Sequence, residues 1–109
     1  CYTGEGCRHT SVPLDLTNPS TLEYQMQFGV YPAKAAGYNA IAFDNYGLQN
    51  QWGACGAFKG PNGTWVQIYN ATDPIHDQKY SADVLSWTRR AVAAIHRLGL
   101  LVIPNFAGY

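Results

Sequence analysis

The chain has 109 residues, of which 47% are hydrophobic, 14% aromatic and 13% charged, and its seven Lys and Arg balance its seven Asp and Glu. This length predicts one domain, spanning residues 1–109, and the apolar content excludes a disordered tail. The zero net charge leaves no basic footprint for nucleic acid or for anionic lipids. No apolar run approaches the ~18 residues of a membrane span, so we expect neither nucleic acid nor membrane as a partner.

The charged fraction is about half of the roughly 25% that is usual for a soluble domain. A surface this poor in charge predicts that something covers it, either a carbohydrate-like ligand or the wall of a larger body supplied by another copy or a further segment. The chain opens without an initiator Met and without a signal-peptide pattern, so we expect a mature or trimmed product.

Three cysteines, Cys1, Cys7 and Cys55, lack the spacing of a zinc site, and we predict no metal. A disulfide of a secreted protein fits them, either Cys7 with Cys55 or Cys1 with Cys7. Two Asn-X-Thr sequons, at 62–64 and 70–72, mark surface loops if the protein is eukaryotic and secreted. These features favour a secreted, extracellular location.

An apolar strip over residues 11–19 leads into the first predicted helix. Asn18 suits the N-cap and Pro19 the first helical position, where its missing N–H would have had no partner. Tyr31-Pro32 predicts a kink or a break, and Gly37 ends the helix. The apolar positions at helical spacing are Leu22, Met26, Val30 and Ala33.

Residues 38–45 are predicted to form a strand with two different faces. Ala40 and Ala42 share one face with Asp44, whereas the other face carries Ile41 and Phe43. A strand that is covered by helices on one face and crowded on the other has this arrangement.

The stretch from residue 46 to residue 78 is rich in Gly and Pro and shows no sustained periodicity, so we predict a long loop. Loops longer than ~15 residues are uncommon unless they are functional. This loop carries aromatic side chains that either stack on a sugar or pack beneath the loop as a local core. They are Tyr46, Trp52, Phe58, Trp65 and Tyr69.

A second helix is predicted to start near Ser81, with Asp83 in its positive first turn, and to stop at Gly99 before an apolar strand over 100–106. Strands that are linked through helices are most simply parallel, so the fold class is α/β. An open doubly wound sheet and a closed (β/α)8 barrel both fit, and both place function at the carboxyl ends of the strands. No glycine-rich phosphate motif occurs, and no cofactor is expected.

The polar residues at these predicted strand ends are Asp15, Asp44 with Asn45, and Asn105. Glycoside cleavage needs two carboxyl groups roughly 5 to 9.5 Å apart, and neighbouring strands ~4.8 Å apart present groups at such distances. The apolar stripe of the second helix is Val84, Leu85, Ala91, Val92, Ile95 and Leu98.

Four segments together resemble the middle of glycoside hydrolase (β/α)8 barrels of the α-galactosidase-like and endo-polygalactosaminidase-like groups. They are Leu14-Asp15-Leu16-Thr17-Asn18-Pro19, the strand from Gly37 to Asn45, Tyr80 with Asp83 and Trp87, and His96 to Asn105. The resemblance implies that Asp44 is the nucleophile or base, and that Asp15 and Asn105 line the sugar subsite.

A complete barrel needs about 250 residues, so the chain offers a partial, half TIM-barrel. Three outcomes follow: a fragment, a composite barrel assembled from two or more copies, or a scaffold that only binds. The sequence therefore predicts a secreted glycoside hydrolase-like protein that acts on an oligo- or polysaccharide. Its predicted catalytic residues are Asp44 and Asp15, and its predicted substrate-binding residues are Asn45, Asn105, Tyr46, Trp52, Trp65 and Tyr69.

Several alternatives remain beside this hypothesis. One is a carbohydrate-binding module without turnover that uses Trp52, Trp65 and Tyr69, and another is a structural half-barrel that pairs with a second copy. Turn capping is the simplest alternative role for Asp44, and Asp15 suits a turn at a helix entry.

Overall fold

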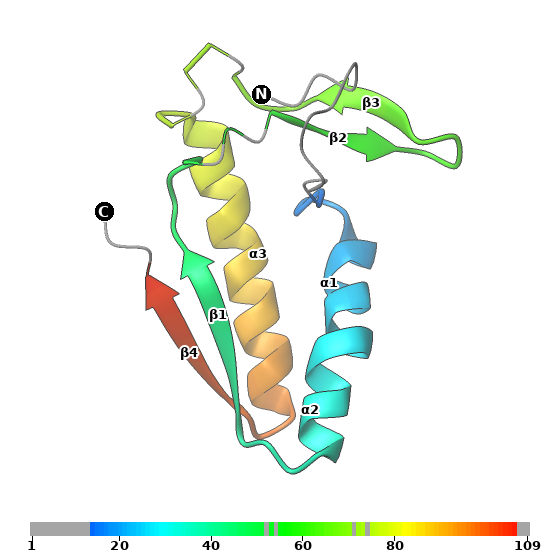
Figure 1. Cartoon of the computed structure of the whole chain (residues 1–109), viewed down its shortest axis with the longest axis vertical. Helices are drawn as coiled ribbons and strands as arrows, with labels where there is room; N and C mark the ends of the chain where they lie inside the picture. The colour runs from blue at the N-terminus through cyan, green and yellow to red at the C-terminus, as the bar shows by residue number, and fades with distance from the viewer. Residues whose placement is uncertain (1–13, 52, 54, 71, 74, 107–109) are drawn as a thin grey trace.

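A computed structural model describes residues 14–51, 53, 55–70, 72–73 and 75–106 of the chain. The chain forms two long helical segments, a parallel pair of strands and a separate antiparallel hairpin (Figure 1). In chain order the elements are α1 (Pro19–Gln25), the π-helical segment η1 (Met26–Val30), α2 (Tyr31–Ala35), β1 (Ala40–Tyr46), β2 (Gly56–Lys59), β3 (Thr64–Gln67), α3 (Gln78–Arg97) and β4 (Leu101–Phe106).

The strands β1 and β4 are parallel neighbours, joined through the hairpin and α3. Their register pairs Ala40 with Leu101 and Phe43 with Pro104. The predicted α/β class and parallel pairing are therefore confirmed. A two-stranded sheet is too small to show a half TIM-barrel, so the barrel stays a prediction.

Both helical segments pack on one face of this sheet. The buried core joins Met26 and Val30 from the first segment to Ile95 and Leu100 from the end of α3 and the turn after it. The strand side chains packed against this core are Ile41, Phe43 and Val102. The sequence pattern thus predicted the covered face of β1 correctly, because alternate residues of a strand point to opposite faces.

The opposite face of the sheet is exposed in the part of the chain that the structure describes, so the crowding predicted for the second face is not found there. Leu101 is 63% exposed and Ile103 is 55% exposed, although both are large apolar residues of β4. Asp44 and Ala42 of β1 are exposed as well. In Figure 1 the two arrows of this sheet lie at one side of the molecule, with α3 between them and α1.

The first helix begins and ends where the sequence predicted. The Asn18 side chain accepts a hydrogen bond from the Ser20 N–H at 3.0 Å, which confirms the cap. The helix is not broken at Pro32. Instead the Tyr31 N–H donates to the Met26 carbonyl, five residues back, and this wider turn makes room for a proline that donates no N–H. Gly37, at φ 90°, follows the end of the helix.

The helix α3 starts three residues earlier than predicted. Asp77 is its N-cap and accepts from the Tyr80 N–H at 2.9 Å, so the predicted start near Ser81 is wrong. Asp83 consequently lies beyond the first turn, and its contacts are described below. The turn signal at Gly99 is confirmed by its φ of 76°. Three residues of the predicted apolar stripe are buried: Val84, Ala91 and Ile95.

The prediction of an irregular loop over residues 46–78 is wrong for its centre, where β2 and β3 form an antiparallel hairpin. Phe58 lies opposite Trp65, with ring centroids 5.2 Å apart. Gly56 is required here, because an added Cβ would lie 2.3 Å from the Val66 carbonyl oxygen and 2.6 Å from the Trp65 ring. Each strand has only four residues, which is too short for sustained periodicity, and this is why the hairpin was missed.

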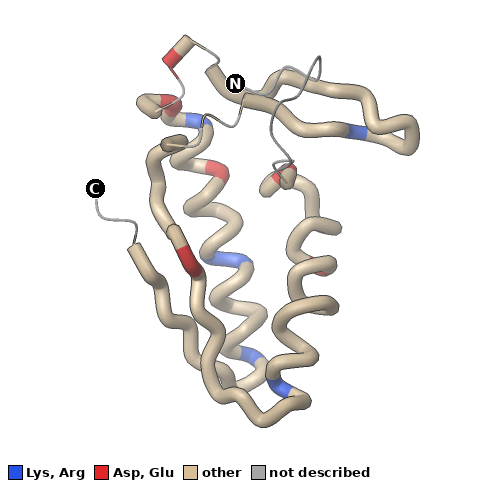
Figure 2. The backbone as a smooth tube through the Cα atoms, in the orientation of Figure 1, with Lys and Arg blue, Asp and Glu red and all other residues tan. Residues whose placement is uncertain are grey.

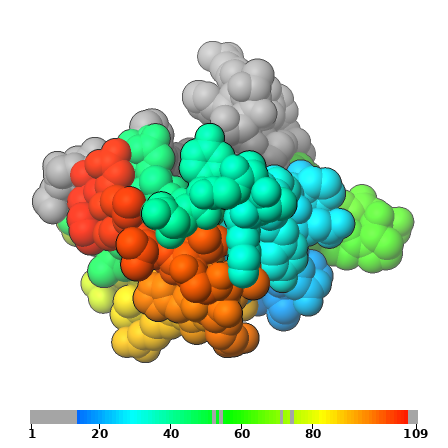
Figure 3. All heavy atoms as spheres, turned by 90° about the horizontal axis from the view of Figure 1, so that it is seen from below, coloured from blue at the N-terminus to red at the C-terminus, as the bar shows by residue number. Residues whose placement is uncertain are grey.

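The end of the molecule opposite the hairpin is held together by hydrogen bonds to backbone carbonyls. Figure 3 shows this end, where the close of α2, the start of β1 and the turn after α3 come together. Lys34 Nζ donates to the Leu98 carbonyl at 2.8 Å, and the Leu101 N–H donates to the Asn39 carbonyl at 2.9 Å. Within the described residues, acidic and basic positions lie on the helices, on β1 and on the hairpin (Figure 2).

Several predictions concern residues that lie outside the described part of the chain. These residues include Cys1 and Cys7, so the disulfide pairing stays a prediction; Cys55 is buried, at 2% exposure. The predicted strip over 11–19 is described only from residue 14, and residues 16–18 form a turn before α1. In the described part of the chain, no helix is long and apolar enough to cross a bilayer.

Candidate functional site

Asp44 and Asn105 lie together at the carboxyl ends of the two parallel strands. Asn105 Nδ2 donates to Asp44 Oδ1 at 2.8 Å, and both side chains are exposed. The contact joins residues 61 positions apart in the chain, as the shared edge of a parallel pair predicts. Of the groups predicted to gather at strand ends, the structure brings Asp44 and Asn105 together, whereas Asp15 lies outside any strand, just before α1.

A β-bulge shapes this site. Between the pairs Phe43–Pro104 and Tyr46–Phe106, two residues of β1 face one residue of β4, so the ladder is irregular there. The extra residue is accommodated at Asn45, whose φ of 51° lies in the left-handed region that asparagine tolerates better than most residues. The Asn45 N–H also donates to Asp44 Oδ1, at 2.9 Å.

The two hydrogen bonds to Asp44 share one carboxylate oxygen. Within the described residues, Asp44 Oδ2 has no hydrogen-bond partner, and the side chain lies on the uncovered face of the sheet. One oxygen is thus oriented by the protein while the other is open to a ligand. A positioned carboxylate of this kind accepts hydrogen bonds from sugar hydroxyls, or acts as a nucleophile or base.

Asp15 has different surroundings. Its Oδ1 accepts from the Thr17 N–H at 3.0 Å and from Thr17 Oγ1 at 2.6 Å, while Lys59 Nζ lies 2.8 Å from Oδ2. The Asp15 side chain is 8% exposed, so the pair connects the turn before α1 to the hairpin. Burial raises the pKa of Asp15, but the hydrogen bonds from Lys59 and Thr17 outweigh it and lower the pKa overall.

The predicted aromatic residues are held in protein contacts. Tyr46 packs its ring against Phe106, with centroids 5.5 Å apart, and its hydroxyl lies 3.0 Å from Thr88 Oγ1 in a hydrogen bond. Trp65 is half-buried against Phe58 on the hairpin. Trp52 lies outside the described residues.

Tyr69 is buried, with 8% of its surface exposed, which agrees with packing as a local core. Its hydroxyl donates to Asp83 Oδ2 at 3.0 Å, and its ring meets Tyr80 edge-on at 5.2 Å. Lys79 forms an ion pair with the same Asp83 oxygen and lies 5.2 Å from the Tyr69 ring centre. Burial, together with the charge of Asp83, raises the pKa of Tyr69 well above its ordinary value of 10.0.

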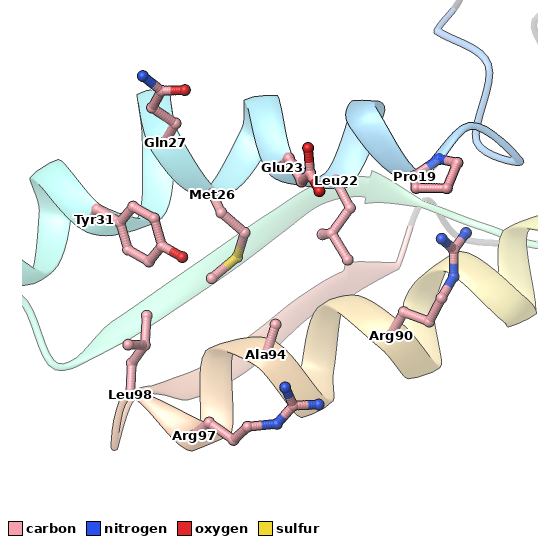
Figure 4. Close-up of a pocket in the computed structure, with 10 residues that line it drawn as sticks. All are labelled: Pro19, Leu22, Glu23, Met26, Gln27, Tyr31, Arg90, Ala94, Arg97 and Leu98. Carbon is pink, nitrogen blue, oxygen red and sulfur yellow. The ribbon is translucent and has the colours of Figure 1, made fainter.

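A groove of about 630 Å3 lies between the first helical segment and α3 (Figure 4). Met26 and Leu98 line it and belong to or pack against the core on the covered face of the sheet, whereas Asp44 lies on the opposite face. The groove is therefore separate from the Asp44–Asn105 site. Arg90 at its rim donates to the Leu16 carbonyl at 2.8 Å. The other lining residues are Pro19, Leu22, Glu23, Gln27, Tyr31, Ala94 and Arg97.

Two features of the structure are not predicted by the sequence patterns. The pairing of Asp15 with Lys59 depends on the hairpin, and a Gly-Pro-Asn-Gly turn between two short apolar runs was the available signal for it. The groove depends on how two helices pack, and no local pattern reports that. In the described ranges, no group of three or more His, Cys, Asp and Glu side chains is placed to hold a metal ion.

A scan against protein-family models, a search of curated proteins and a search of solved structures each found no match to this chain.

Proposed function

We propose that this chain is a secreted, carbohydrate-active domain in which Asp44 serves as the nucleophile or base of glycosidic bond hydrolysis. The observation that carries the proposal is the hydrogen bond from Asn105 Nδ2 to Asp44 Oδ1 at the carboxyl ends of adjacent parallel strands. Function gathers at such ends in α/β folds, because the loops that follow the strands form a cleft there.

The geometry suits a carboxylate that must point in one direction. Asn105 and the Asn45 N–H fix Oδ1, so that Oδ2 keeps its lone pairs for a sugar hydroxyl, a water molecule or an anomeric carbon. Bulges are common beside active sites, and here the bulge lies directly after Asp44, at Asn45.

Asp15 supports a different role within the same proposal. Because Lys59 and Thr17 favour its charged form, Asp15 is suited to accept hydrogen bonds and not to donate a proton to a leaving group. The acid of a two-carboxylate mechanism then comes from a group other than Asp15. A second copy that covers the exposed face around Leu101 and Ile103, and so extends the half-barrel, is the source we propose.

The second candidate is carbohydrate binding without turnover. It is favoured by the ion pair between Asp15 and Lys59, because hydrolysis needs two available carboxyl groups and Asp15 is occupied. Binding needs only the oriented carboxylate of Asp44 and the carboxamide of Asn105. Both candidates place the sugar at Asp44 and Asn105, and they differ in whether a bond is broken.

The test is the Asp44→Asn variant, assayed against a panel of aryl-glycosides and for retention on insoluble polysaccharides. Asp73→Asn is the matched control, because Asp73 is an exposed carboxylate that pairs with His76 and lies outside the site. If Asp44 is catalytic, its variant loses at least about 100-fold in kcat while binding survives, and the control keeps full activity.

Three outcomes separate the alternatives. Loss of turnover with retained binding supports hydrolysis, and azide rescue of Asp44→Ala with formation of a glycosyl azide would identify the nucleophile. Binding that is lost in Asp44→Asn, from a wild type that never turns over, supports the binding module. If neither activity is found in the wild type, or if both persist unchanged in the variant, the proposed function is wrong.

A further inference from the structure

The tip of the β2–β3 hairpin carries one of the two sequons of the chain, Asn62-Gly63-Thr64. The four residues between the strands form a tight turn, in which the Gly63 N–H donates to the Gly60 carbonyl at 3.1 Å. Gly60 and Gly63 have φ values of 72° and 61°, so both need glycine. The turn therefore presents residues 61 and 62 at the far end of the hairpin.

The surroundings of this turn are open. Asn62 is exposed, and within the described residues its side chain makes no hydrogen bond. A Cβ added at Gly60 or at Gly63 would have no atom within 4 Å, so the first and last residues of the turn are not packed against other parts of the protein. A large group attached to the Asn62 amide would extend away from the described part of the chain.

Thr64, the third residue of the sequon, is also exposed and begins β3 opposite Lys59. Its register leaves the hydroxyl at the same end of the hairpin as the Asn62 amide. A hydroxyl two residues after the acceptor asparagine is the feature that distinguishes a usable sequon from an ordinary asparagine.

From this arrangement we infer that Asn62 is the acceptor of an N-linked glycan, attached on passage through a eukaryotic secretory pathway. The donor is an oligosaccharide linked to a lipid pyrophosphate. The bond between the anomeric carbon and the pyrophosphate oxygen breaks, a bond from that carbon to Asn62 Nδ2 forms, and one amide proton leaves as the lipid pyrophosphate departs. No oxidant or reductant is required. The inference rests on secretion and does not depend on Asp44.

The second sequon has a different environment, and the inference does not extend to it. Asn70 Oδ1 accepts from the Thr72 N–H at 2.9 Å and from the Asp73 N–H at 3.2 Å, and the Asn70 N–H donates to Asp77. Asn70 is thus built into the approach to α3. Residue 71 of that sequon lies outside the described part of the chain.

A glycan at Asn62 also has a physical use at this position. A two-stranded hairpin has free edges, and this one exposes Phe58 to 40% and Val66 to 39%. Exposed apolar residues beside unpaired strand edges favour association between chains. A hydrated sugar chain at the tip would keep a second hairpin from pairing there.

The experiment is cell-free translation of the 109-residue chain, preceded by a cleavable signal peptide, in the presence of microsomes. Chains inside the microsomes are selected by protease protection, and sugar chains are counted as mass increments removed by an endoglycosidase. We expect Asn62→Gln to lose one increment relative to the wild type. Thr64→Ala should lose the same increment although Asn62 is present, whereas Thr64→Ser, which keeps the hydroxyl, should retain it.

The inference is overturned if the protected wild type and Asn62→Gln carry the same number of sugar chains. That number would be zero if neither sequon is used, or one if only Asn70 is used. Retention of the increment in Thr64→Ala would also overturn it, because the attachment would then not follow the sequon. Addition occurs during translocation, so a variant that fails to fold still reports on the acceptor.

Discussion

Asp15 and Asp44 are chemically the same residue in two different electrostatic environments. Asp15 has both oxygens occupied, by Thr17 and by Lys59, and is nearly buried. Asp44 is exposed and has one oxygen held by Asn105. Asp15 therefore connects the turn before α1 to the hairpin, whereas Asp44 is the carboxylate that is available to a ligand.

The Lys59–Asp15 pair predicts a pH-dependent contribution to stability. The pKa of Asp15 is lowered in the folded chain, so the pair stabilises the fold above the ordinary pKa of 3.8, and this stability is lost as the pH falls through the lower folded-state pKa. We expect Lys59→Met to reduce the free energy of unfolding by about 1 kcal/mol at pH 7.

The measurement is urea unfolding of both proteins from pH 7 to pH 2. The difference between wild type and Lys59→Met should shrink at the acid end, where Asp15 is protonated in both. Lys34→Met is the control, because Lys34 donates to the Leu98 carbonyl and its effect should not follow a carboxylate. A Lys59→Met difference that is constant over this range would contradict the assignment.

At the scale of single elements, helix ends illustrate how local chemistry sets boundaries. The first helix begins at the residue after Asn18, whose side chain satisfies the otherwise unpaired Ser20 N–H at 3.0 Å. We expect Asn18→Ala to lower the free energy of unfolding by about 1 kcal/mol. Ser20→Ala, an exposed position in the same turn, should change it by less than about 0.5 kcal/mol. Equal effects in urea unfolding would argue against the cap.

Tyr69, which follows β3 by two residues, connects the hairpin to α3. Its hydroxyl donates to Asp83 Oδ2, and its neighbour Gln67 donates through Nε2 to the Tyr69 carbonyl at 3.1 Å. Because the tyrosine is buried, its loss of a proton is opposed by desolvation and by the adjacent carboxylate. The connection therefore holds the hairpin only while the hydroxyl keeps its proton.

We expect Tyr69→Phe to lower the free energy of unfolding by about 1 to 2 kcal/mol at neutral pH. The pKa of Tyr69 is raised in the folded state, so its contribution is full below the ordinary value of 10.0 and declines as the pH rises above it, because the unfolded chain then loses the proton first. The gap between wild type and variant should accordingly narrow above about pH 10.

Chemical denaturation at pH 8 and pH 11 measures this gap. Tyr24→Phe is the control, since Tyr24 is 58% exposed on α1 and its contact is with the Phe28 ring. If the Tyr69→Phe gap is unchanged at pH 11, the hydroxyl does not carry the connection.

For the whole molecule, the covered and uncovered faces of the sheet differ most. Helices cover Ile41 and Phe43, while Leu101 and Ile103 lie more than half exposed on the other face. Burial of apolar surface is worth about 25 cal/mol per Å2, so covering this face is favourable. This is the physical ground for the second copy in the proposed function.

Light scattering over a range of protein concentrations tests self-association. We expect the wild type to form a dimer or larger species, and Ile103→Lys to shift it to monomer. Ile75→Lys is the matched control, because Ile75 is 46% exposed but lies in the approach to α3 and not on the sheet. A wild type that remains monomeric at all concentrations would contradict association through this face.

The sequence by itself determined the features that depend on neighbours in the chain. The cap at Asn18, the turn at Gly99 and the alternation that turns Phe43 inward and Asp44 outward are each decided within a few residues. The α/β class and the meeting of Asp44 with Asn105 follow as well, because strands linked through a helix pair in parallel and share one edge.

Tertiary structure decided what depends on contacts between distant segments. The hairpin is stable because Phe58 meets Trp65 across strands too short to show a period, and because Tyr69 is fastened to Asp83 on α3. The structural role of Asp15 depends on its ion pair with Lys59, a residue of the hairpin. The sequence does not distinguish an aspartate that pairs with a lysine from one that faces solvent, and only the folded chain brings Lys59 within 2.8 Å of Asp15.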